Sequence, residues 1–103
     1  MEIDELKKQS DRSFETALAK QNALEKARSR MVFAYDGHLF LANAETINLV
    51  KTMSDRDTFV LLDTNDNPAL IDDPTAFLSK LIERNQEVLN SYHQIYVELQ
   101  KLR

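Results

Sequence analysis

One run in the middle of the chain has the residue types and the spacing of a metal site. Asp63, Asn65 and Asn67 stand at alternate positions, like the first three side-chain ligands of a calcium-binding loop. Pro68 then stands where that loop needs glycine, and Pro74 stands where it needs a bidentate glutamate. A polar β turn, in which Asx side chains bond their own backbone, accounts for the same residues. We therefore expect a turn here and no metal ion.

Candidate catalytic side chains are few and scattered. The two histidines, His38 and His93, fall in different predicted elements, and we expect both to face solvent. The chain has no cysteine, which excludes a thiolate nucleophile and a thiolate metal site. Its single glycine, Gly37, cannot build a glycine-rich phosphate loop or the tight turn around a nucleophilic serine. The sequence predicts no catalytic residue and no cofactor, so we expect a protein that is not an enzyme.

The strongest pattern in the chain lies in residues 73–103. Apolar residues recur there at alternating spacings of three and four, which predicts a long helix with a heptad seam of four repeats. Ile82, Leu89 and Tyr96 form a neighbouring row, so the apolar stripe is wider than a two-stranded seam needs. We expect this stripe to bind a protein partner. The seam consists of Leu78, Leu81, Asn85, Val88, Tyr92, Ile95, Leu99 and Leu102.

Asn85 is the one polar residue in this seam, and it allows two interpretations. A buried asparagine between helices of different chains selects their register and oligomeric state. Asn85→Leu is then expected to raise stability and to loosen the choice of oligomer. Alternatively, Asn85 lies at the edge of a packing surface within one chain. The sequence does not decide between the two.

The rest of the chain divides into an N-terminal helix and a mixed middle. Residues 1–30 predict a long amphipathic helix, although its apolar stripe is interrupted. Residues 31–72 predict a hairpin around Asp36-Gly37, a helix over 44–53 capped by Asn43, and a second hairpin with strands at 58–62 and 69–71. Residues 73–103 add the heptad-patterned helix, with Asp73 as its N-cap. We expect one α+β domain over 1–103, in which the long terminal helices pack antiparallel or in a helical bundle beside the β hairpins and the short helix.

Charge and hydropathy exclude several classes of partner. The net charge is −4, and residues 31–72 carry seven acidic and two basic side chains, which disfavours nucleic acid. The aspartates around the second hairpin form either a surface for a basic partner or, as we prefer, solvated turn and cap groups. No apolar run is long enough to span a membrane, and the charged start is not a secretory signal. We expect a cytoplasmic protein, found in the virion or the host cytoplasm if a phage encodes it.

The predicted order of elements is similar to that of the α-type subunits of prefoldin, chaperones with hairpins between two terminal helices. Only the order of elements carries this resemblance, and it implies a chaperone-like role. The small, glycine-poor composition also resembles that of tailed-phage accessory and structural proteins.

Together these patterns predict a non-enzymatic assembly or interaction protein, such as a phage or viral structural or accessory protein. We expect it to form a homo-oligomer, or to bind a protein partner, through the seam of its C-terminal helix. A chaperone-like or regulatory module that binds a client protein is the first alternative. A small ligand-binding domain or enzyme is the second.

Overall fold

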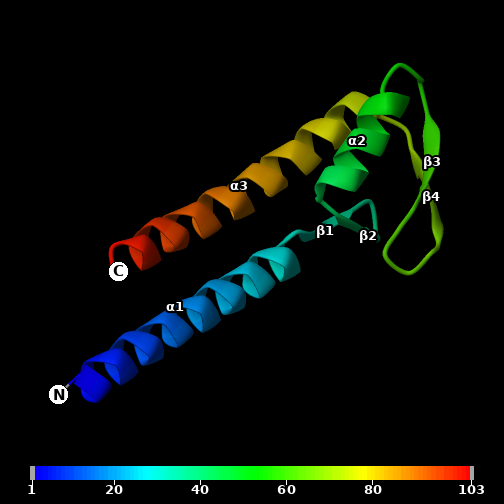
Figure 1. Ribbon diagram of the computed structural model, residues 1–103. Coiled ribbons are helices and arrows are strands. Elements are labelled where there is room, and N and C mark those ends of the chain that lie inside the picture. The colour runs from blue at the N-terminus through cyan, green and yellow to red at the C-terminus, as the bar shows by residue number, and fades with distance from the viewer. Residues whose placement is uncertain (1, 103) are drawn as a thin grey trace.

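The computed structural model describes residues 2–102, with side chains from residue 12 onward. It is an α+β protein with three helices and two small antiparallel sheets, and its C-terminal helix is long, as predicted (Figure 1). The elements follow the predicted order of helix, hairpin, helix, hairpin and helix. They are α1 (Glu2–Arg30), β1 (Val32–Tyr35), β2 (His38–Leu41), α2 (Ala44–Met53), β3 (Phe59–Leu62), β4 (Pro68–Ile71) and α3 (Pro74–Gln100).

The first hairpin turns at the residues that the sequence predicts. Tyr35 pairs with His38, so Asp36 and Gly37 form a two-residue loop between β1 and β2. Their φ angles are 51° and 79°, as a type I′ turn requires at both central positions. Gly37 therefore has a conformational role, because no neighbouring atom lies where its Cβ would stand.

Both predicted helix N-caps, Asn43 and Asp73, form as expected. The side chain of Asn43 accepts a hydrogen bond from the main-chain N–H of Thr46 at 2.9 Å and begins α2. Asp73 accepts one from Ala76 N–H at 3.2 Å and begins α3, where Pro74 has no N–H to lose. The caps place α2 and the first turns of α3 around one core.

That core lies where the N-terminal half of α3 meets α2 and the inner faces of the two hairpins. Phe77 of α3 is fully buried and contacts Phe33, Tyr35 and Phe40 of the first hairpin, with ring centroids 4.8 to 6.1 Å apart. Aromatic packing at these distances adds to the burial of apolar surface. The other buried members are Ala42, Val50, Phe59, Ala69, Ile71 and Leu81.

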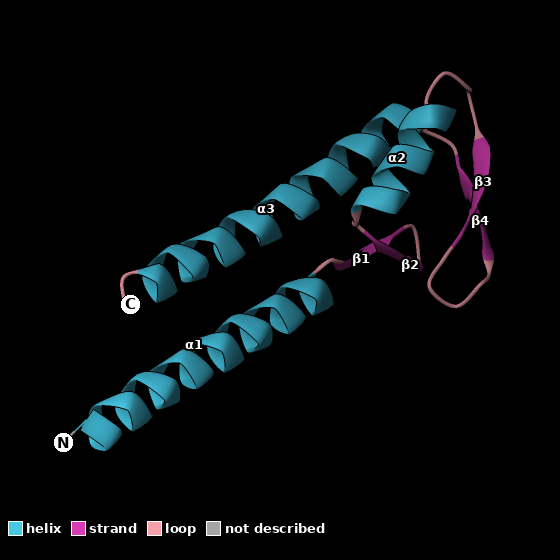
Figure 2. Ribbon diagram, in the orientation of Figure 1, coloured by secondary structure: helices cyan, strands magenta, loops and turns pink. Residues whose placement is uncertain are grey.

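Beyond the core, α1 and α3 extend side by side as a stalk, with both chain ends at its tip (Figure 1). Figure 2 shows the two hairpins at the opposite end. The molecule measures 69 × 23 × 19 Å, and its radius of gyration is 19.4 Å, against about 13 Å for a compact domain of this length. None of the helices in the described residues is long and apolar enough to cross a membrane.

Candidate functional site

The run that resembles a calcium loop forms the turn of the second hairpin. Oδ1 of Asp63 accepts hydrogen bonds from the main-chain N–H groups of Asn65, at 2.8 Å, and Asn67, at 2.9 Å. Its Oδ2 lies 2.7 Å from Nδ1 of His38. Both carboxylate oxygens are therefore engaged within the chain, and the prediction of a polar turn is confirmed. Within the part of the chain that the structure describes, no three His, Asp or Glu side chains are grouped so as to hold a metal ion.

His38 is not the free surface residue that we expected. The hydrogen bond from His38, followed by those from the turn, lowers the pKa of Asp63. An ionised carboxylate only accepts, so Nδ1–H of His38 donates to it. Beside this pair, the N–H of Thr64 donates to the carbonyl of Leu39 at 2.9 Å. These two contacts join the turn of the second hairpin to β2, which gives the His–Asp pair a structural role.

A histidine oriented by a carboxylate is also the arrangement of a general base. Among the described residues, however, no serine or threonine hydroxyl hydrogen-bonds to His38. His93, on the exposed surface of α3, belongs to a different element.

The seam of α3 divides into a covered half and an uncovered half. Leu81, Asn85 and Val88 are buried within the chain, because α1, α2 and the first hairpin cover the first half of α3. Towards the C-terminus the cover thins, since only α1 lies alongside. Of the remaining seam residues, Leu78, Tyr92 and Leu99 are half-buried, and Ile95 and Leu102 are exposed.

Asn85 finds its partner inside the chain. Its Nδ2 donates to the main-chain carbonyl of Ala42 at 2.9 Å, and its Oδ1 accepts from Nε2 of Gln86 at 3.1 Å. Asn85 thus fastens α3 to the connection between β2 and α2. This contact agrees better with the interpretation that Asn85 belongs to a packing surface within one chain. Asn85 is, however, buried and does not lie at the edge of that surface.

Phe77 lies at the centre of the core, but the predicted seam does not include it. The heptad assignment begins at Leu78, whereas the face that enters the core runs from Pro74 through Phe77 to Leu81. The spacing of three and four residues in this series was a signal that could have identified Phe77.

The neighbouring row of α3 is only partly covered. Ile82, Leu89 and Tyr96 are 43%, 39% and 38% exposed, although they repeat every seven residues like a packing face. Phe14 and Leu18 of α1 are exposed as well. These five residues, together with the exposed seam residues Ile95 and Leu102, are called the stalk surface below.

A groove of about 730 Å³ opens between α1 and the end of α3. Thr16 and Lys20 line it from α1, and Leu99 and Leu102 line it from α3. The ammonium of Lys20 lies 5.7 Å from the ring centroid of Tyr96, a cation–π contact across the groove. The two helices therefore touch without covering each other's apolar residues fully.

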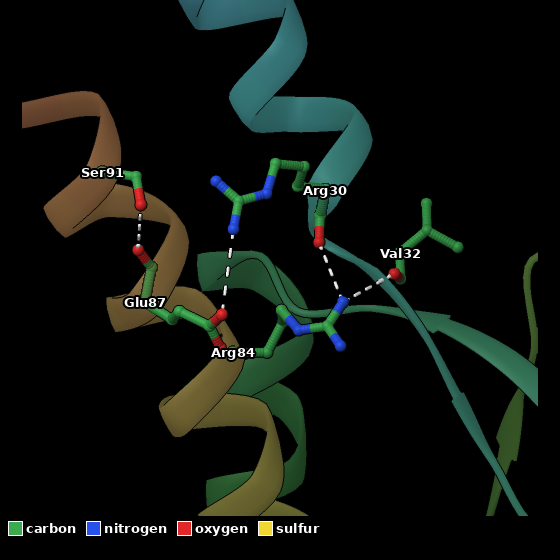
Figure 3. Close-up of polar contacts among 5 residues, drawn as sticks. All are labelled: Arg30, Val32, Arg84, Glu87 and Ser91. Carbon is green, nitrogen blue, oxygen red and sulfur yellow. Dashed lines mark hydrogen bonds and ion pairs between the residues drawn. The ribbon is translucent and has the colours of Figure 1, made fainter. Parts of the chain in front are cut away.

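Polar contacts fix the base of the stalk (Figure 3). Nη1 of Arg84 donates to the carbonyls of Arg30 and Val32, at 3.1 Å each. A cation at the last carbonyls of a helix also interacts favourably with the helix dipole. The guanidinium of Arg30 in turn lies 3.8 Å from the carboxylate of Glu87, whose main-chain carbonyl accepts from Ser91. Arg84 therefore holds the end of α1 against the middle of α3.

No protein-family model, curated protein or solved structure matches this chain. The resemblance to prefoldin subunits rests on the predicted order of elements alone, and an order of elements does not transfer function. The function is argued below from the residues of this chain.

Proposed function

We propose that this protein is a non-enzymatic assembly protein whose chains self-associate. In this proposal α1 and α3 pack antiparallel as a stalk, and the stalk surface packs against a second copy in a helical bundle. The partner-binding residues are the uncovered part of the predicted seam and its neighbouring row.

The observation that carries this proposal is the area of the molecular surface. The chain exposes 7772 Å². A folded monomer of 11.9 kDa exposes about 5,950 Å². The excess of about 1,800 Å² lies within the roughly 1,000–2,500 Å² that each chain of an obligate homodimer buries. The excess is thus of the size that an interface with a second copy would bury.

The chemistry of the stalk surface supports the same proposal. Its residues are apolar, and α3 repeats them with the period that helices use to pack on helices. Burying them between chains removes apolar area from water, which favours association by about 25 cal/mol per Å² before the costs of association are subtracted.

Light scattering over an about hundredfold range of protein concentration tests the proposal. We expect a discrete dimer or larger oligomer. Leu89→Gln/Ile95→Gln keeps good or acceptable helix formers but removes apolar contacts, and is expected to lower the mass. Leu49→Gln, on the exposed side of α2, is the matched control and should leave the mass unchanged. A wild-type monomer at every concentration would overturn the proposal.

The groove between α1 and α3 favours a second candidate function, the binding of a client protein. Its open, mixed apolar and polar lining suits a segment of another protein. This function predicts a monomer that binds a hydrophobic dye, with the binding reduced by Leu99→Gln. A discrete oligomer that binds no dye contradicts it.

A further inference from the structure

The turn between β1 and β2 places an aspartate directly before the single glycine of the chain. Asp36 and Gly37 are both exposed, and no neighbouring atom lies within 4 Å of the point where a Cβ on Gly37 would stand. Asp36 has a φ angle of 51°, in the left-handed region that L residues rarely adopt. Because glycine has no side chain, its main-chain nitrogen is unshielded. This nitrogen is therefore free to approach the carboxyl group of the preceding residue.

Neither of these two groups is engaged elsewhere. Among the residues that the structure describes, no ion pair involves the carboxyl group of Asp36. Within the same residues, the N–H of Gly37 donates to no main-chain carbonyl, and the carbonyl of Asp36 accepts from no main-chain N–H. The peptide unit between the two residues can therefore turn towards the side chain without losing a hydrogen bond of its own.

The second hairpin contains an aspartate of the same backbone conformation whose neighbour is held. Asp66 has a φ angle of 61° and is also exposed, but the residue after it is Asn67. The N–H of Asn67 donates to Oδ1 of Asp63 at 2.9 Å, and its side chain shields the nitrogen. The fold therefore holds the peptide unit after Asp66 and leaves the one after Asp36 free.

We propose that Asp36-Gly37 is a site of spontaneous modification, at which the aspartate is converted through a cyclic imide into isoaspartate. The nitrogen of Gly37 attacks Cγ of the protonated carboxyl group of Asp36. The N–Cγ bond forms, the Cγ–OH bond breaks, and the hydroxyl group leaves with the N–H proton as one water molecule.

Hydrolysis of the imide completes the conversion. One water molecule adds to the main-chain carbonyl carbon of Asp36, and the bond from that carbon to the nitrogen of Gly37 breaks. The chain then continues through Cβ and Cγ of this residue, and its mass is the same as before. Addition of water at Cγ instead restores the aspartate. The inference does not depend on the proposed function, since it concerns the first hairpin alone.

Isoaspartate changes the turn on which the first hairpin depends. It adds one main-chain atom to the loop, and the length of the loop sets the register of the strands. The pair that closes the loop is Tyr35 with His38. The ring of Tyr35 packs on Phe77 with centroids 4.8 Å apart, and Nδ1 of His38 lies 2.7 Å from Oδ2 of Asp63. The modification is therefore expected to weaken both the core and the contact between the hairpins.

Peptide mapping of the whole chain, after prolonged incubation at neutral pH and physiological temperature, tests the inference. Trypsin releases residues 31–51 as one peptide, in which Asp36 is the only aspartate. We expect an isoaspartyl form of this peptide, with a changed elution time, an unchanged mass and distinct electron-transfer fragments. A form lighter by one water molecule is expected to precede it. Isoaspartate at position 36 should exceed that at position 66 several-fold, and equal amounts at the two positions would overturn the inference.

Two variants keep the turn and change its chemistry, because Gly-Gly and Asn-Gly also favour type I′ turns. Asp36→Gly has no carboxyl group and is expected to give no isomer. Asp36→Asn closes the same ring with loss of ammonia, so its isoaspartyl product has a different mass from the starting chain. This product is expected to form faster than in the wild type, since an amide reacts without first being protonated. An Asp36→Asn chain that stays intact would show that the turn prevents ring closure, and the inference would be wrong.

Incubation of the wild-type chain unfolded in guanidinium chloride separates protection by the fold from slow chemistry. Isoaspartate at position 36 in the unfolded chain but not in the folded chain would overturn the inference.

Urea unfolding of the incubated proteins tests the effect on the hairpin. The isomerised fraction of the wild type is expected to unfold at a lower urea midpoint than the unmodified fraction, whereas incubated Asp36→Gly keeps its midpoint. Equal midpoints for the two wild-type fractions would contradict the expected weakening of the core.

Discussion

The side-chain amide of Asn85 donates a hydrogen bond to the main-chain carbonyl of Ala42, 43 positions earlier in the chain, at 2.9 Å. The contact is buried, and it joins α3 to the segment that leads from the first hairpin into α2. This hydrogen bond explains a polar residue in an apolar seam without a second chain. Because of it, we expect removal of the amide to lower the stability of the protein, whereas a seam between chains predicts an increase.

Asn85→Leu is expected to lower the free energy of unfolding by about 1–3 kcal/mol, because it leaves the buried carbonyl of Ala42 without its donor. Urea unfolding at low protein concentration measures the change. Asn90→Leu, at an exposed position of the same helix, is the control. A gain in stability from Asn85→Leu would restore the interpretation of a seam between chains.

Phe77→Ala is expected to cost about 3–5 kcal/mol, because it opens a cavity among the aromatic rings of the core. Phe14→Ala removes the same atoms from a side chain that is 70% exposed, so the stability of the monomer should hardly change. The comparison also separates folding from assembly, since Phe14→Ala is expected to weaken self-association. Equal losses of monomer stability in the two variants would show that the core is misplaced.

The contribution of Asp63 to stability is expected to depend on pH. Its pKa is lower in the folded chain than in the unfolded one, so its ionised contacts stabilise the fold above the unfolded value, about 3.9, and are lost as the pH falls through the lower folded value. Asp63→Asn should therefore destabilise the protein at about pH 5, and the difference from wild type should shrink towards about pH 2. Urea midpoints measured across this range test it, and a difference independent of pH would contradict it.

Arg84→Ala is expected to cost about 1–2 kcal/mol, because it removes the donor to two carbonyls at the partly exposed base of the stalk. Arg84→Lys should recover only part of the loss, since an ammonium does not reproduce the planar guanidinium. Arg28→Ala, which removes an exposed arginine of α1, is the control for charge. Thermal unfolding compares the three variants, and an unchanged Arg84→Ala protein would show that other contacts hold α1 against α3.

The local elements could be predicted because their causes act over a few residues. Asp36-Gly37 adopts the backbone of a type I′ turn, and Asn43 and Asp73 accept from N–H groups three positions later. Asp63 accepts from the N–H groups two and four positions later, within its own turn. Turns and caps of this kind depend only on residues that are close together in the sequence. The α+β class and the order of its elements follow from it.

The tertiary structure alone decided which apolar residues are covered and which polar residues are paired. His38 meets a carboxylate 25 positions away, and Asn85 a carbonyl 43 positions away. The heptad pattern shows that α3 has an apolar stripe, but Leu81 enters the core and Leu102 remains exposed, although both are seam residues. Whether a side chain is buried depends on which elements pack against it. A periodic pattern indicates only which side of the helix is apolar.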